Sequence, residues 1–149
     1  MKLVMQRVSQ ASVTVDHQCI GEISRGMVVL IGVGQGDTEL TVDRMIEKII
    51  HLRIFSDDDG KMNRSLIDVA GSLLLISQFT LYADCRKGRR PAFISAAAPD
   101  AAKELYEYFV ERCRGVGVPV ACGRFAADMQ VALINDGPVT ILLDSQEFI

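Results

Sequence analysis

The chain has 149 residues, of which 49% are hydrophobic and 23% are charged, and its formal net charge is −3. This length fits one domain over residues 1–149, and such a domain can bury roughly 68–70% of the surface of its unfolded chain. The composition excludes a disordered chain. The acidic charge argues against a protein that wraps nucleic acid, but not against contact with one end of it through a small basic patch.

The sequence also predicts a compartment and the absence of cofactors. The longest apolar runs, such as residues 27–33, are too short to span a bilayer. The N-terminal residues do not resemble a secretory signal, so we expect the cytoplasm. The four cysteines form no C-x-x-C motif, and neither histidine lies at a metal-ligand spacing from them. We therefore expect reduced thiols, no metal site and no cofactor.

The first third of the chain is predicted to be mostly strand. Residues 3–8 are strand-like, residues 11–15 alternate, and residues 19–23 read as the returning strand of a hairpin. Residues 27–33 form a β-branched run typical of a strand covered on both faces. The glycines of residues 32–37 lack the third glycine of a dinucleotide-binding motif, so they indicate a strand exit.

Two helices are predicted. The first begins at Asp37 or Thr38 and runs to about Arg53. Pro99 and Asp100 begin the second, which ends near the glycines at 115 and 117. The acidic run at residues 56–60 lacks the EF-hand spacing and is predicted to be a turn. The apolar stripes that the two helices are expected to bury are Val42, Met45, Ile46, Ile49 and Ile50 in the first, and Ala102, Leu105, Phe109 and Cys113 in the second.

The second half adds further strands. Residues 73–81 form an apolar run that ends in Ser77, Gln78 and Thr80 and is followed by a basic loop. Another strand begins at residue 119, and strands at 129–134 and 139–143 flank an Asn-Asp-Gly-Pro turn. This order predicts an α+β single domain with a curved, mostly antiparallel sheet or barrel and two main helices.

Two stretches could carry chemistry. The polar end of the strand, residues 77–80, either presents polar groups at the rim of a site or is an ordinary strand end whose hydroxyls bond to the local backbone. The turn at residues 135–138 is either a plain hairpin turn or a rigid element, since tight turns are where cis X-Pro bonds occur. Spacing supports neither a Ser-His-Asp grouping nor a buried carboxylate pair. Conventional side-chain acid–base catalysis is therefore not expected.

Together, these stretches place the chain beside a known family. From end to end it resembles the D-aminoacyl-tRNA deacylases, also called D-tyrosyl-tRNA deacylases. The main departure is the loop at residues 83–89, which is more basic than the family pattern. The matching segments are Gln6-Arg7-Val8, Ala11-Ser12-Val13-Thr14-Val15, Gly21-Glu22-Ile23, Arg53-Ile54-Phe55-Ser56-Asp57, Gly60-Lys61-Met62-Asn63, Ser77-Gln78-Phe79-Thr80-Leu81, Arg90-Pro91-Ala92-Phe93, Gly123-Arg124-Phe125-Ala126-Ala127-Asp128-Met129 and Asn135-Asp136-Gly137-Pro138-Val139-Thr140.

The resemblance implies an activity and an assembly. Members of the family hydrolyse the ester between a D-amino acid, or glycine as a side substrate, and the 3′-terminal adenosine of tRNA. They act in the cytosol as homodimers and without a metal. Their Gly-Pro turn is cis and reaches into the partner's pocket. The carbonyls of Gly137 and Pro138 would then exclude an L-aminoacyl group, because rejection through buried polar groups can be large.

The resemblance also implies residue roles. Ser77, Gln78, Phe79 and Thr80 would form the catalytic segment, with the backbone N–H groups of Phe79 and Thr80 as donors to the oxyanion. Thr80 could be the nucleophile, but no neighbouring base is evident to activate it, so we expect it to position groups. The attacking water would be oriented by the ribose 2′-hydroxyl of the substrate and the main chain.

The family pattern assigns the tRNA contacts to further residues. Arg7, Phe125 and Met129 would hold the terminal adenosine. For the last two, plain core packing is the alternative.

A second group is basic. It would contact acceptor-stem phosphates, with a solvated loop as the alternative. Its members are Arg86, Lys87, Arg89 and Arg90. Two other functions stay open for the whole chain: a non-catalytic ligand-binding or structural dimer, and a general esterase that cleaves L-esters equally well.

Overall fold

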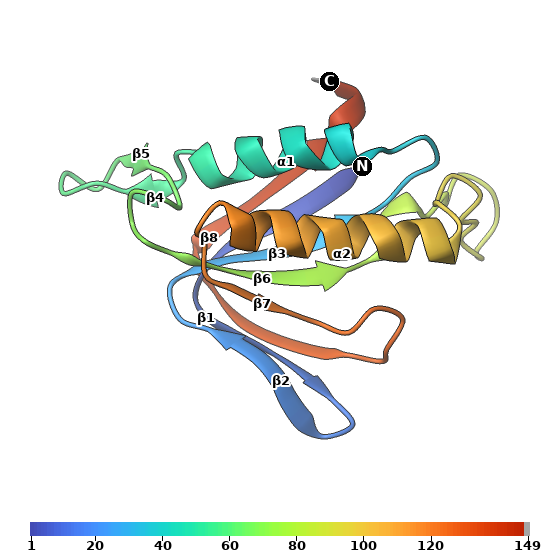
Figure 1. Ribbon diagram of the computed structural model, residues 1–149, viewed down its shortest axis with the longest axis horizontal. Helices are drawn as coiled ribbons and strands as arrows, with labels where there is room; N and C mark the ends of the chain where they lie inside the picture. Colours follow the sequence, from blue (N-terminus) through green and yellow to red (C-terminus); the bar gives the residue numbers. More distant parts are fainter. Residues whose placement is uncertain (148–149) are drawn as a thin grey trace.

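The structure is a computed structural model that describes residues 1–147. It is an α+β fold in which two helices cover one face of a strongly curved sheet (Figure 1). The elements in chain order are β1 (Lys2–Val15), β2 (Gln18–Ile23), β3 (Gly26–Gly32), α1 (Glu39–His51), β4 (Phe55–Ser56), β5 (Met62–Arg64), β6 (Ser72–Ser77), the 3₁₀ turn η1 (Phe79–Tyr82), α2 (Pro99–Gly115), β7 (Val120–Cys122), β8 (Gln130–Asp144) and the 3₁₀ turn η2 (Ser145–Glu147).

Strand β1 is the centre of the sheet. One of its edges pairs antiparallel with β3 and then β2, and its other edge pairs antiparallel with β8. Beyond β3, strands β6 and β7 continue in parallel. The sheet curls until β2 approaches β7, where a Cβ atom at Gly21 would lie 3.2 Å from the carbonyl oxygen of Cys122. The expected curved, barrel-like sheet with two helices is confirmed, and two of its pairings are parallel.

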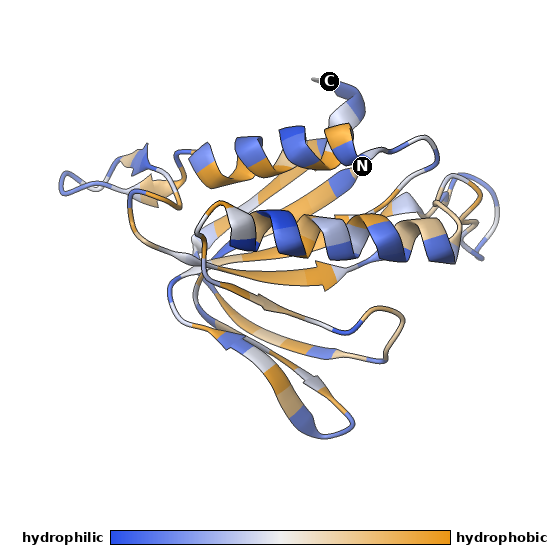
Figure 2. Cartoon of the chain, in the orientation of Figure 1, coloured by the Kyte–Doolittle hydropathy of each residue, from blue (hydrophilic) through white to orange (hydrophobic). Residues whose placement is uncertain are grey.

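The curl divides the apolar interior into two clusters. The larger lies between the sheet and the two helices and contains Phe55, Phe109 and Tyr106. The smaller lies inside the curl, around Val13 and Ile76. In Figure 2 the apolar colouring runs along the strands that lie beneath the helices. One wall of the smaller cluster is β6, so the polar residues that follow β6 emerge from a rigid support.

The predicted helices are confirmed with one shift. Thr38 caps α1 through hydrogen bonds with Thr41, and the whole predicted stripe of α1 is buried. In α2 the ring of Tyr106 is buried in place of the half-buried Leu105, because the Tyr106 hydroxyl donates a hydrogen bond to the carbonyl of Leu75, 2.9 Å away. The Cys113 thiol is buried, and burial raises its pKa to about 12.

Three predicted elements differ from the structure. Residues 3–8 and 11–15 form one strand, β1. Strand β6 ends at Ser77, and the chain continues through Gln78 into η1, so the expected strand does not reach Thr80. Residues 129–143 are not two strands of a hairpin, because both halves of β8 pair with the same neighbour, β1. The Asn-Asp-Gly-Pro segment is therefore a bulge in one strand.

The predicted turn at residues 56–60 joins β4 and β5. Asp57 accepts backbone hydrogen bonds there from Asp59 and Lys61. Within residues 1–147, neither helix is long and apolar enough to cross a membrane.

Candidate functional site

The chain turns sharply where β6 ends. The Gln78 N–H donates to the carbonyl of Ile31 at 2.7 Å, which fixes the exit of the strand on β3. The Leu81 N–H then donates to the Gln78 carbonyl and closes the first turn of η1. The side chain of Gln78 donates to the Thr80 hydroxyl at 2.5 Å. Thr80 thus accepts a hydrogen bond from an amide and is exposed to solvent.

A cavity of about 510 Å³ opens beside this turn. Its walls come from the end of β6, the start of α2 and the segment between β7 and β8. None of the described residues that line it carries an ionisable side chain. The residues that line the cavity are Ile76, Ser77, Gln78, Phe79, Ala96, Ala97, Pro99, Ala102, Phe125, Ala126, Ala127, Met129 and Val131. Any chemistry in this cavity has to use main-chain groups, hydroxyls, an amide or the ligand itself.

Phe125 and Met129 form the apolar part of the cavity. The ring of Phe125 lies 6.0 Å from that of the buried Tyr106. Met129 fills the space that a side chain at position 123 would occupy, since a Cβ atom at Gly123 would lie 2.5 Å from the Met129 sulfur. Both residues are half-buried, and they combine the two alternatives: they pack against the core clusters and also face the cavity.

The Gly-Pro segment is a different kind of structure. Gln6 pairs with Thr140 and Val8 pairs with Asn135, so residues 136–139 lie opposite a single residue of β1, Arg7. The Gly137–Pro138 peptide bond is cis, as the family resemblance implied. Gly137 has a φ of +134°, a backbone conformation that side chains with a Cβ atom rarely adopt. Both residues are exposed on the edge strand β8.

Two side chains hold this bulge. Arg7, only 9% exposed, donates from Nε to the Asp136 carbonyl at 3.0 Å and from Nη1 to the Ile54 carbonyl at 2.6 Å. The Asn135 carboxamide accepts from the Val139 N–H at 2.9 Å and donates to the Thr140 hydroxyl at 3.0 Å. The bulge is thus fixed from below by a buried cation and from its own ends by an amide.

The structure divides the predicted site residues into two groups within one protomer. Ser77, Gln78 and Phe79 line the cavity together with the two apolar residues, and Thr80 lies directly beside it. Gly137 and Pro138 do not line it. Arg7, predicted to contact adenosine, is instead placed under the bulge and is not part of the cavity wall.

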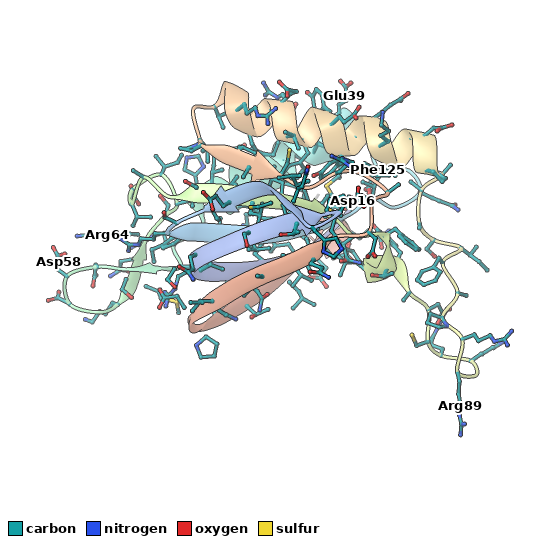
Figure 3. The ribbon with its side chains drawn as sticks, turned by 90° about the horizontal axis from the view of Figure 1, so that it is seen from below. Asp16, Glu39, Asp58, Arg64, Arg89 and Phe125 are labelled. Carbon is teal, nitrogen blue, oxygen red and sulfur yellow. The ribbon has the colours of Figure 1, made fainter. Side chains whose placement is uncertain are left out.

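The basic loop is a short arm, residues 84–92. Asp84 and Ala92 exchange two backbone hydrogen bonds that close its base. The Arg86 guanidinium binds the Asp84 carboxylate at 2.7 Å and holds the pKa of that carboxyl well below its usual range. Arg89 projects from the tip, far from Arg64 on the other side of the molecule (Figure 3).

The sequence reasoning did not find the small residues in the cavity wall. Ala96, Ala97 and Pro99 lead into α2, and Ala126 adopts a positive φ of 60°. Their short side chains leave the space that a ligand could fill. The run of three alanines before Pro99 is a local signal that could have pointed to them.

The fold and the cavity define a class: an α+β protein that can bind an apolar or uncharged group beside a sharp main-chain turn. A family model described as D-Tyr-tRNA(Tyr) deacylase matches residues 4–144. The D-aminoacyl-tRNA deacylase of Rhodopirellula baltica is 60% identical over 97% of this chain and 99% of that protein. That of Clostridioides difficile is 57% identical over 99% of each chain. This chain belongs to the D-Tyr-tRNA(Tyr) deacylase family and, as a member, is an enzyme.

Two solved structures are also similar. One, described as the c-Myc DNA unwinding element binding protein, has a TM-score of 0.91 and 42% sequence identity, covering 97% of this chain and 98% of its own. The other, described as a probable eukaryotic D-amino acid tRNA deacylase, has a TM-score of 0.75 and 18% identity, covering 95% and 97%. The second supports the fold alone.

Proposed function

We propose that this enzyme hydrolyses the ester bond of D-aminoacyl-tRNA in the cytoplasm and releases the D-amino acid and free tRNA, with glycyl-tRNA as a further substrate. The observation that carries the proposal is the uncharged cavity beside η1, in a chain of this family. Such a site suits the hydrolysis of an ester. Its carbonyl can be polarised by main-chain donors, and its leaving group is already a good one compared with an amide.

The main chain at the start of η1 supplies the proposed oxyanion donors. The first N–H groups of a helical turn have no partner within that turn. Those of Phe79 and Thr80 are in this position, beside the cavity. Each such donor typically contributes a factor of about 10²–10³ in rate. The ribose 2′-hydroxyl of the substrate, with the main chain, orients the attacking water, because the cavity wall offers no general base.

Thr80 has a positioning role in this proposal. Its hydroxyl accepts the hydrogen bond from the Gln78 side chain and thereby fixes the carboxamide at the cavity wall. A nucleophilic hydroxyl needs a neighbouring base. Thr80→Ala is therefore expected to slow turnover without abolishing it. Complete loss of turnover with substrate binding intact would restore Thr80 as the nucleophile.

The terminal adenosine is expected to lie against Phe125 and Met129. An aromatic ring and a thioether give an apolar surface on which a base can stack. The ring of Phe125 is supported from behind by Tyr106. The aminoacyl ester would then reach Ser77 and the start of η1, which line the same cavity.

Selection against L-aminoacyl groups is proposed to come from a second copy of the chain. Gly137 and Pro138 lie on the exposed strand β8, which also carries Ile134, 53% exposed, and Leu142, 73% exposed. Such an apolar edge suits burial in a homodimer. There the carbonyls of the bulge would enter the partner's cavity and leave no room for an L side chain.

Ester hydrolysis on matched substrates tests the activity. We expect release of the D-amino acid from D-aminoacyl-tRNA, slower release from glycyl-tRNA, and no release from the L form. Equal cleavage of the L form would indicate a general esterase. Binding without release of the D form would indicate a non-catalytic module.

Mixed dimers test the shared site. A subunit with Phe125→Asp has no working cavity, and a subunit with Gly137→Val has a displaced bulge. If the site is shared, the mixed dimer carries one site in which both defects meet and one in which neither occurs. We therefore expect the purified mixed dimer to have about half of the selective activity of the parent dimer. No recovery in a purified mixed dimer would contradict a site shared between subunits.

A further inference from the structure

A pair of aromatic rings, Phe79 and the half-buried Phe93, lies at the rim of the cavity. Phe79 lines the cavity and is 57% exposed. Its ring centroid lies 4.9 Å from that of Phe93, with the rings edge to face. The next residue, Ile94, is 82% exposed. Large apolar side chains exposed together beside a cavity indicate a surface that another molecule covers.

The same segment leads into the basic arm, residues 84–92. Four of the 16 Lys and Arg residues of this acidic chain lie within residues 86–90. Arg86 is bound to Asp84 and so belongs to the structure of the arm. Lys87, Arg89 and Arg90 are exposed, and no carboxylate within residues 1–147 pairs with them. Three uncompensated cations are thus held on a loop whose base is closed by two hydrogen bonds.

We propose that the ring pair and the arm tip form one binding track for the 3′ end of an RNA. The base that precedes the terminal adenosine stacks on Phe93 and Phe79. Lys87, Arg89 and Arg90 bind the phosphates on the 5′ side of that base. Aromatic rings interleaved with cations are the usual means of holding single-stranded nucleic acid without reading its sequence. This inference rests on the proposed function, because it takes the cavity as the place of the terminal adenosine.

The track explains how an acidic protein can bind a polyanion. Its charge is unfavourable on average, so attraction has to be local, and the arm concentrates it on one side of the cavity. Arg86 differs from the other three cations, with which it is grouped in the sequence, because it is bound to Asp84. Charge removal at Arg86 would release Asp84 and disturb the arm, so that position is left intact in the test.

The first experiment compares two triple variants with the same change of charge. One is Lys87→Ala/Arg89→Ala/Arg90→Ala, and the other, on α1 and the β4–β5 hairpin, is Arg44→Ala/Lys61→Ala/Arg64→Ala. Each is assayed with D-aminoacyl-tRNA and with D-aminoacyl-adenosine, which lacks the phosphates.

We expect the arm variant to raise KM for the tRNA about tenfold or more with kcat unchanged. The slope of log(kcat/KM) against log salt concentration is negative, and its magnitude should decrease by about two. Both variants should cleave the adenosine ester like the parent chain.

The second experiment tests the ring pair. Phe93→Leu keeps apolar volume but removes the ring, and Phe93 lies outside the cavity wall. With D-aminoacyl-adenosine, KM should not change. With the dinucleotide ester D-aminoacyl-cytidylyl-adenosine, which adds the preceding base, KM should rise about fivefold or more.

Each outcome has one meaning. Equal behaviour of the two triple variants toward tRNA would overturn the track. A loss toward D-aminoacyl-adenosine in the arm variant would also overturn it, since the arm would then act through the cavity. Failure of the parent chain to cleave either substrate would instead overturn the proposed function.

Discussion

The cavity beside η1 and the bulge of β8 are built in opposite ways. The cavity is lined by apolar and neutral side chains, and its polar surface is main chain, a hydroxyl and an amide. The bulge is exposed, yet a buried cation and a carboxamide fix it through three hydrogen bonds, and the cation is itself anchored on the Ile54 carbonyl. The described cavity wall contains no ionisable side chain, and the one carboxylate of the bulge, that of Asp136, lies 3.4 Å from Arg7 Nε.

The difference suggests a division of labour. A cavity without charges suits a reaction driven by main-chain donors and by the substrate's own hydroxyl. A segment held rigidly at an exposed edge suits discrimination, because rejection by shape fails if the rejecting group can move. Changes in the cavity should therefore alter turnover or substrate binding, whereas changes in the bulge should alter the ratio between D and L substrates.

The largest expected effect is loss of a main-chain donor. Phe79 is the first residue of η1, a position where proline fits, so Phe79→Pro removes its N–H while keeping the turn. We expect kcat for D-aminoacyl-adenosine to fall about 10²–10³-fold. Phe79→Ala, which keeps the N–H, should retain kcat.

Glu39→Pro is the matched control for this backbone change. It places proline at the first position of α1, after the Thr38 cap and outside the cavity wall. Its kcat should equal that of the parent chain. If Phe79→Pro turned over substrate as fast as Phe79→Ala, the N–H of residue 79 would not be an oxyanion donor.

A smaller effect is expected at the bulge. A Cβ atom at Gly137 would lie 2.9 Å from the Val139 side chain and 3.0 Å from Arg7 Nη2, at a φ of +134°. Gly137→Ala should displace the bulge by this crowding and raise the L-to-D ratio of kcat/KM about tenfold, as expected for strain of about 1–2 kcal/mol. Gly60→Ala has a positive φ of 78° with no atom near its Cβ, and should leave the ratio unchanged. An unchanged ratio in folded Gly137→Ala would assign selectivity to the cavity itself.

A few-fold effect is expected on adenosine binding. Gly123→Ala would place a methyl group 2.5 Å from the Met129 sulfur and push that side chain into the cavity. KM for D-aminoacyl-adenosine should rise about threefold to tenfold, in line with the 1–3 kcal/mol typical of overpacking. The L-to-D ratio should not move. If the ratio changed more than KM, the cavity and the bulge would not be separable.

The smallest effect concerns pH. Since the described cavity wall has no ionisable side chain, no enzyme group should add an inflection to log(kcat/KM) between pH 5 and 8. The substrate's α-amino group remains the one expected titration in this range. His17→Gln and His51→Gln should each change kcat/KM less than twofold. A bell-shaped profile that one of these substitutions abolishes would place a histidine in the reaction.

The cavity wall could be predicted only in part. Ser77, Gln78 and Phe79 follow an apolar run, so their place at a strand end follows from local sequence. Arg7 could not be placed in this way, because its acceptors lie 47 and 129 residues further along the chain. An arginine in a matching motif looks like a ligand contact until its hydrogen bonds are known.

The sequence by itself determined the helices, the buried strands and the two motifs, because amphipathic periodicity, caps and turn residues act over a few neighbouring positions. Tertiary structure decided that residues 130–144 form one strand and that Gly137 and Pro138 stand out from it as a bulge. It also decided that β6 gives way to a 3₁₀ turn after Ser77. The reason is physical: both halves of β8 gain their backbone hydrogen bonds from β1, more than 100 residues away, and no local pattern encodes that pairing.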